Sequence, residues 1–209
     1  MNKENKAFSV RPAYRVGTVQ EYYFSKKLKE VAAMNAAGKR VISLGIGSPD
    51  LPPSEVAVKT FQREVARPDV HGYQPYTGMP ELRLGYAAWY EQWYGVTLDA
   101  DREVLPLIGS KEGILHVSMA FLNPGEGVLV PNPGYPTYIS VSRLVGAELV
   151  PYTLEASRGW LPDFEALERL VAEREAALCP PIKLMWANYP NMPTGADASD
   201  ELLERLVNF

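Results

Sequence analysis

Gly109-Ser-Lys-Glu-Gly113 is a segment whose residue types could bind an anion. It lies between an apolar run that predicts a strand and a stretch with helical spacing. The backbone N–H groups of a helix's first turn attract a phosphate, and the Ser110 hydroxyl adds a donor. An ordinary strand-to-helix turn is the alternative. A Walker A loop is excluded, because Lys111 is followed by Glu112 and no glycine lies five residues before Gly109.

Two further segments follow predicted strands and carry ligand-like side chains. In Pro131-Asn-Pro-Gly-Tyr-Pro-Thr-Tyr138, rigid prolines would hold Tyr135 where it could stack on a planar ring. The alternative is a proline-stiffened loop with an aromatic core anchor. In Asn188-Tyr-Pro-Asn-Met-Pro-Thr-Gly195, the asparagines could hydrogen-bond a ligand, and the alternative is a plain turn rich in Pro, Asn and Gly. Because each of the three loops follows a predicted strand, their combination indicates a ligand site.

The elements that must position these loops alternate between strands and helices in the second half of the chain. This alternation predicts βαβ units and a mostly parallel sheet, an α/β fold. Strands are predicted over residues 41–44, 103–108, 127–130, 148–152 and 182–187. Helices are predicted over residues 25–37, from Ser54 to 66, from Pro80 onward, and over 110–121, 136–144, 162–177 and 199–209.

Composition excludes several classes of function. The net charge is −4, and no run of five or six Lys/Arg residues exists, so no nucleic-acid partner is expected. No apolar stretch approaches the ~18–20 residues that span a bilayer, so no membrane partner is expected. A single cysteine, Cys179, and no evident signal peptide predict a cytoplasmic protein. His71 and His116 lie far apart in the sequence, and no metal site is predicted.

The three loops, together with Gly45-Ile-Gly-Ser-Pro-Asp50 and Gly72-Tyr-Gln-Pro-Tyr-Thr-Gly-Met-Pro-Glu-Leu-Arg83, resemble class I/II aminotransferases of pyridoxal-phosphate (PLP) fold type I. The resemblance runs from about residue 40 to the end. It implies PLP as cofactor, an amino acid and a 2-oxo acid as substrates, and a homodimer. It also implies an N-terminal arm and small-domain segment over residues 1–50, and a partial PLP-binding large domain over residues 51–209.

The resemblance also implies individual roles. Gly47 corresponds to the glycine beside the substrate carboxylate. Tyr73 corresponds to a tyrosine that reaches the phosphate of the partner subunit's cofactor. Ser110 and Lys111 correspond to the phosphate-binding loop, and Tyr135 to the aromatic residue that stacks on the pyridine ring.

One departure from the family lies in the third loop. The residue before Pro-Thr-Gly is usually an asparagine that hydrogen-bonds the cofactor's phenolic oxygen, whereas here it is Met192. Asn191 or Asn188 could replace it. We expect Asn191 to bind the cofactor, with the choice between the two left open.

The second departure is that the sequence ends at Phe209. The family places the aspartate that pairs with the pyridine nitrogen, the Schiff-base lysine and a substrate-binding arginine after this point. Lys111 and Lys183 do not occupy the lysine position, so no catalytic residue is assigned. We expect an N-terminal portion of an aminotransferase that is inactive alone and binds PLP weakly or not at all. The alternatives are a non-catalytic remnant acting as a binding or dimerisation module, or another fold-type-I chemistry such as a lyase or a decarboxylase.

Overall fold

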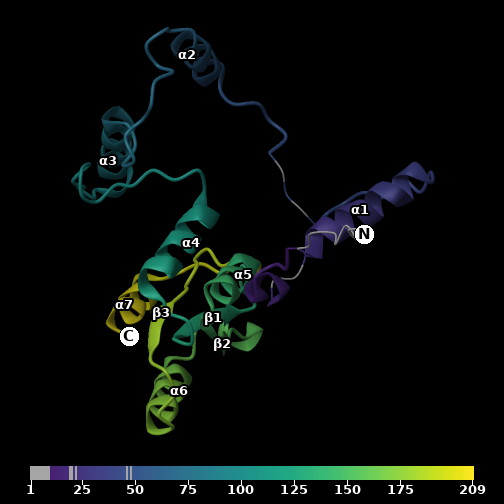
Figure 1. Ribbon diagram of the computed structural model, residues 1–209, viewed down its shortest axis with the longest axis vertical. Coiled ribbons are helices and arrows are strands. Elements are labelled where there is room, and N and C mark those ends of the chain that lie inside the picture. The colour runs from purple at the N-terminus through teal and green to yellow at the C-terminus, as the bar shows by residue number, and fades with distance from the viewer. Residues whose placement is uncertain (1–9, 19–20, 22, 46, 48) are drawn as a thin grey trace, which may run out of the picture. The chain divides into compact units, whose positions relative to one another are not determined.

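The computed structural model describes residues 10–18, 21, 23–45, 47 and 49–209 (Figure 1). These described residues divide into two compact units. One unit, here called the sheet unit, comprises residues 109–209 and the described part of residues 1–20. The other, here called the helical unit, comprises the described part of residues 21–108.

A parallel sheet forms the centre of the sheet unit. Its strands are β1 (Gly127–Asn132), β2 (Glu148–Thr153) and β3 (Ile182–Met185), in the order β2-β1-β3. Both neighbours pair with β1 in parallel, Val128 lying opposite Leu149 on one side and Leu184 on the other. The central strand β1 is buried over its first five residues, as is typical of a parallel sheet covered on both faces.

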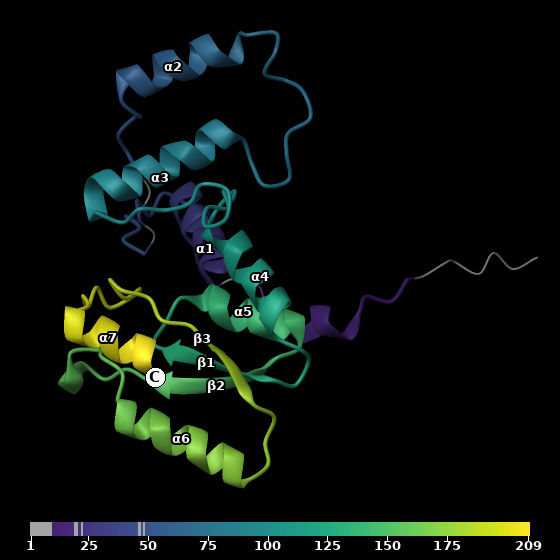
Figure 2. The same cartoon turned by 90° about the vertical axis from the view of Figure 1, so that its left-hand side faces the viewer.

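Helices cover both faces of this sheet. Val128 and Val130 of β1 belong to the core cluster that α4 (Ser110–Phe121) and α5 (Pro136–Val145) cover, whereas Leu129 belongs to the cluster on the opposite face. The opposite face is covered by α6 (Phe164–Ala176) and α7 (Asp200–Asn208) (Figure 2). Side chains alternate between the faces of a strand, so β1 contributes to both cores.

Local signals fix the ends of these helices. Asp163 and Ser199 are the N-caps of α6 and α7, and each side chain accepts a hydrogen bond from a first-turn N–H group. Helix α5 begins with Pro136 and ends before Gly146, whose φ of 82° lies in the left-handed region. Two 3₁₀ helices, η1 (Tyr14–Thr18) and η2 (Ala156–Arg158), complete the sheet unit.

The helical unit contains α1 (Tyr23–Ala36), α2 (Glu55–Val65) and α3 (Pro80–Tyr94). The predicted capping of α2 by Ser54 is confirmed, because its hydroxyl accepts from the Ala57 N–H group. Arg83 of α3 is 7% exposed, the one buried residue among the described residues of this unit. Its guanidinium donates hydrogen bonds to the 77–78 turn and to residues 100–101.

Two predicted strands are wrong. Residues 41–44 and 103–108 form irregular structure or turns, and they belong to no sheet. Their apolar side chains mimic a buried strand, yet Ile42 and Leu44 are exposed and Ile108 is 97% exposed. A strand needs a neighbour with which to form hydrogen bonds, and the local pattern does not supply one. Strand β3 is also shorter than predicted, ending at Met185 rather than residue 187.

The remaining helices and strands agree with the predicted positions within a few residues, and the predicted α/β fold with a mostly parallel sheet is confirmed. No helix among the described residues is long and apolar enough to cross a membrane. Within the same part of the chain, no group of three or more His, Cys, Asp or Glu side chains could hold a metal ion.

Candidate functional site

Two of the predicted loops leave the sheet at neighbouring strand ends and run in opposite directions. The loop after β1 leads to α5 on one face, and the loop after β3 leads to α7 on the other face (Figure 2). Because β1 and β3 are adjacent, the strand order reverses between them. Ligands of parallel α/β sheets bind in the crevice at such a point, outside the carboxyl ends of the strands.

Helix α4 covers the same face of the sheet as α5. It precedes β1 through a short connection and runs obliquely in roughly the opposite direction to that strand, so that the N-terminal end of α4 is nearer than its C-terminal end to the carboxyl end of β1 (Figure 2). Gly109 is the N-cap and has no side chain to accept from the first-turn N–H groups. A methyl group on Gly109 would meet no atom of the described residues within 4 Å. An anion could therefore approach the backbone here, which fits a phosphate group.

Tyr135 lies at the start of α5, as its N-cap. It is half-buried, and its ring centroid lies 5.7 Å from that of Tyr138 at an interplanar angle of 84°. The loop before it is tight, since a Cβ on Gly134 would lie 2.5 Å from the Pro131 carbonyl oxygen. This loop presents a partly exposed aromatic ring that could stack on a planar ligand.

Asn191 organises the loop after β3. It is 3% exposed, and its Oδ1 accepts hydrogen bonds from the Thr194 hydroxyl at 2.9 Å and from the Thr194 N–H group at 3.5 Å. Its backbone bonds to Gly195 and Ala196 close the same loop. The side-chain oxygen of Asn191 is thus engaged within the protein, which leaves its amide nitrogen as the group for a ligand.

Asn188 and Met192 form a second contact in this loop. The Met192 N–H group donates to Asn188 Oδ1 at 3.1 Å, and the Met192 side chain is about half exposed. The Asn188 amide nitrogen therefore faces away from this bond. Both asparagines keep an amide donor, and the choice between them for the cofactor oxygen stays a prediction.

Tyr73 and Gly47 belong to the helical unit. Tyr73 is 94% exposed, and a Cβ on Gly47 would have no described atom within 4 Å. Ile46 and Ser48, in the same motif as Gly47, lie outside the described residues. In the sheet unit, Ser110 and Lys111 begin α4, Tyr135 follows β1, and Asn191 lies in the loop after β3. The roles assigned to all six residues stay predictions.

Sequence reasoning missed the residues behind Tyr135. Tyr138 is buried, and its ring stacks on that of Trp186 with centroids 5.1 Å apart and an interplanar angle of 11°. The Tyr152 hydroxyl donates to the Trp186 carbonyl oxygen at 2.7 Å. Burial raises the pKa of Tyr138 and that of Tyr152 above the ordinary value. The i, i+3 spacing of Tyr135 and Tyr138 was the available signal, since such residues share one face of a helix.

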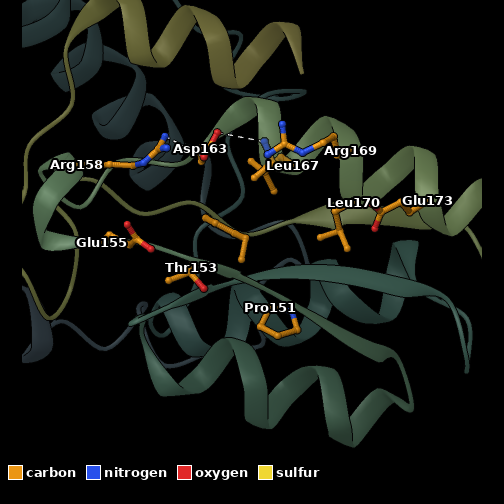
Figure 3. Close-up of a pocket in the computed structure, with 11 residues that line it drawn as sticks. Pro151, Thr153, Glu155, Arg158, Asp163, Leu167, Arg169, Leu170 and Glu173 are labelled. Atoms are coloured by element: carbon orange, nitrogen blue, oxygen red, sulfur yellow. Dashed lines mark hydrogen bonds and ion pairs between the residues drawn. The ribbon is translucent and has the colours of Figure 1, made fainter.

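A cleft of about 400 Å³ lies elsewhere on the sheet unit, between the outer edge of β2 and α6 (Figure 3). Its carboxylate Asp163 caps α6 and pairs with Arg158 at 2.9 Å, while Arg169 and Glu173 are exposed. Its charged groups are thus used in local structure or lie in solvent. The loops at the carboxyl edge remain the stronger candidate site.

Comparison with known proteins agrees with this fold. The family model of aminotransferase class I and II matches residues 39–209. The LL-diaminopimelate aminotransferase of Desulforudis audaxviator is 43% identical over 197 residues, which cover 94% of this chain and 48% of that protein. That of Moorella thermoacetica is 40% identical over 200 residues, covering 96% of this chain and 50% of that protein.

Solved structures give the same picture. Apo-BacF from Bacillus subtilis superimposes with a TM-score of 0.86 at 37% identity, over 97% of this chain and 50% of that one. Alanine aminotransferase from Pyrococcus furiosus gives a TM-score of 0.81 at 27% identity, over 95% and 49%. The chain spans about half the length of these relatives. The predicted resemblance is confirmed, and the chain belongs to the class I and II aminotransferase family.

Proposed function

We propose that this chain forms the cofactor-binding part of a PLP-dependent aminotransferase, which transfers an amino group between an amino acid and a 2-oxo acid. The observation that carries the proposal is the reversal of the strand order between β1 and β3, where the loop with Tyr135 follows one strand and the Asn188–Asn191 segment follows the other. Helix α4 packs in the same core cluster as Tyr135. Family membership supports the reaction class.

The α4 N-terminus is the proposed phosphate site. The start of a helix attracts anions, and a Cβ on Gly109 would meet no described atom within 4 Å, so that an anion could come close to the backbone. The Glu112 N–H group already donates to the Gly109 carbonyl oxygen, so the proposed anion site consists of the N–H groups that precede it. The Ser110 hydroxyl adds a donor, and the Lys111 ammonium offsets the phosphate charge. The Glu112 carboxylate lies in the same turn.

Tyr135 and the loop after β3 are the proposed ring site. Tyr135 offers a flat face, while an asparagine amide of the loop donates to an oxygen on the ring. When bound, PLP supplies an electron sink for the carbon that carries the amino group. The residues of this chain bind and orient that ring and hold its phosphate.

The proposal also covers the substrate and the oligomeric state. The relatives named above make LL-diaminopimelate the first amino donor to test. Gly47 would lie beside the substrate carboxylate. Tyr73, whose side chain is almost fully exposed, would reach a second copy of the chain in a homodimer. A cytoplasmic location and a domain boundary near residue 50 complete the proposal.

We further propose that the 209 residues by themselves support no transamination. In the described sheet unit, Lys111 lies in the proposed phosphate site and Lys183 is exposed on β3, so neither amine is assigned the covalent role. The second candidate function, a binding or dimerisation module, is favoured by the same observation. Transaminase turnover that scales with the concentration of the purified chain would contradict both the proposed inactivity and the binding-module alternative.

Pyridoxamine 5′-phosphate tests the binding site without any covalent step, because it carries the ring and the phosphate but needs no Schiff base. Titration calorimetry should detect saturable binding to the 209-residue chain. Gly109→Ala should weaken binding about tenfold, the equivalent of roughly 1–2 kcal/mol at a helix N-terminus. Gly85→Ala in the middle of α3, where a methyl group also meets no described atom within 4 Å, is the matched control. Equal affinity in both variants would refute the phosphate site.

A further inference from the structure

The Tyr135 side chain packs against the core cluster that includes Tyr138. It is half-buried, and the ring contact recorded for it is the edge-to-face contact with Tyr138. Its backbone is fixed by the tight turn at Gly134 and by the start of α5. The side chain, however, would turn freely about its own bonds without a neighbouring surface, so its orientation depends on what lies behind it.

The surface behind Tyr135 is the stacked pair of Tyr138 and Trp186. Tyr138 comes from α5, whereas Trp186 directly follows β3. Their rings are nearly parallel, with centroids 5.1 Å apart. The pair thus joins the two loops that leave the sheet on either side of the point where the strand order reverses.

Backbone bonds fix the Trp186 end of this pair. The Trp186 N–H group donates to Leu129 of β1 at 2.9 Å, and the Tyr152 hydroxyl of β2 donates to the Trp186 carbonyl oxygen at 2.7 Å. The indole N–H group is buried and has no acceptor among the described residues. The ring is therefore positioned by its backbone and by stacking, and not by a hydrogen bond of its own.

We propose that Tyr138 and Trp186 are positioning residues, which hold the ring of Tyr135 in the orientation that accepts a planar ligand. This inference rests on the proposed function for the identity of the ligand. The ordering of the Tyr135 ring does not rest on it. Edge-to-face and stacked pairs contribute modest energies, so that loss of the Tyr138 ring weakens binding of a stacked ligand about two- to tenfold.

Fluorine NMR tests the ordering without any ligand. All tyrosines of the 209-residue chain are labelled with 3-fluorotyrosine, and the Tyr135 resonance is assigned by its disappearance in Tyr135→Phe. The resonance should shift toward the position found in unfolded protein in Tyr138→Leu and in Trp186→Leu. It should stay in place in Tyr138→Phe, which keeps the ring, and in Val141→Ala.

Val141 is the matched control because it is buried in the same core cluster and on the same helix but carries no aromatic ring. If Val141→Ala moves the Tyr135 resonance as far as Tyr138→Leu does, the effect is general loosening and the proposal fails. An unchanged resonance in Tyr138→Leu and Trp186→Leu also overturns it. Far-UV circular dichroism identifies the variants that fold. If Tyr138→Leu does not fold, Trp186→Leu alone provides the test.

Ligand titrations then separate the two proposals. Pyridoxamine 5′-phosphate should bind Tyr138→Leu more weakly, while inorganic phosphate binds it as well as it binds the unaltered chain. In a Tyr135→Ala background, Tyr138→Leu should have no further effect, because it acts through Tyr135. An additive loss in the double variant would overturn the positioning role. If the unaltered chain binds neither ligand, the proposed function fails, and the NMR result still decides whether the ring is held.

Discussion

Replacing Arg83 with methionine should open the helical unit locally. Arg83 Nε donates to the Ala100 carbonyl oxygen at 2.9 Å, and its Nη1 donates to Gly78 O at 2.6 Å and to Thr77 Oγ1 at 2.9 Å. Its ion pair with Asp101 adds little, because the Asp101 side chain is mostly exposed. Methionine fills similar space but donates none of these bonds.

The size of the effect follows from these three bonds. A hydrogen bond from a charged donor contributes about 1.5–3 kcal/mol when buried, and partial exposure of the acceptors lowers this to about 1 kcal/mol each. We therefore expect a loss of about 3 kcal/mol, or roughly a hundredfold increase in local opening. Since Arg83 is the one buried residue among the described part of this unit, little else opposes the opening.

Amide hydrogen exchange measures this opening residue by residue. The Gly78 N–H group, which donates to Pro75, and the Glu103 N–H group, which donates to Asp99, should exchange about a hundredfold faster in Arg83→Met. Amides of β1 should be unaffected. Arg102→Met is the control, since the Arg102 side chain is exposed and its ion pair with Asp99 is 4.0 Å long. Equal protection of Gly78 in Arg83→Met and the unaltered chain would refute the reasoning.

Other parts of the chain give further predictions. Gly134→Ala should lower the free energy of unfolding by about 1–3 kcal/mol in urea titrations, because its Cβ would lie 2.5 Å from a carbonyl oxygen, whereas Gly109→Ala should leave it unchanged. Burial raises the pKa of Tyr152, so the stability that its protonated hydroxyl contributes should be constant below the unfolded pKa of about 10 and lost as the pH rises further. In Tyr152→Phe, the melting temperature should therefore fall less steeply between pH 8 and pH 11. Pro151→Val should promote association in sedimentation velocity, because it adds an N–H group to the outer edge of β2, and Thr153→Val on the same edge should not.

Much of the sheet unit could be predicted from local signals. The apolar run at β1 is a strand, and the cap at Ser199 begins a helix, because each depends on residues close in sequence. The 103–108 segment has a similar apolar pattern but no partner strand, and pairing is a property of residues far away in the chain. A strand prediction fails where no neighbouring strand is present to pair with, since the local sequence pattern describes only one of the two strands that must form hydrogen bonds.

The candidate site residues could be chosen from the sequence, but the orientation of their side chains could not. Gly109 and Tyr135 follow from motif spacing, since a helix N-terminus and a strand end have known geometry. The use of Asn191 within its own loop could not be read from the sequence, because either end of an asparagine can bond to backbone or ligand. The Tyr138–Trp186 stack joins residues on different elements, and only the folded sheet brings them together.

The order of the strands also implies an order of assembly in time. Gly127 of β1 pairs with Glu148 of β2 and, at more than twice that sequence separation, with Ile182 of β3. Closing the longer loop costs about 1 kcal/mol more in chain entropy, so the parallel β1–α5–β2 unit should form first and β3 should dock onto it. During synthesis and refolding, Tyr135 would thus be in place on its loop before Trp186 arrives, and the aromatic stack would be among the last contacts to form.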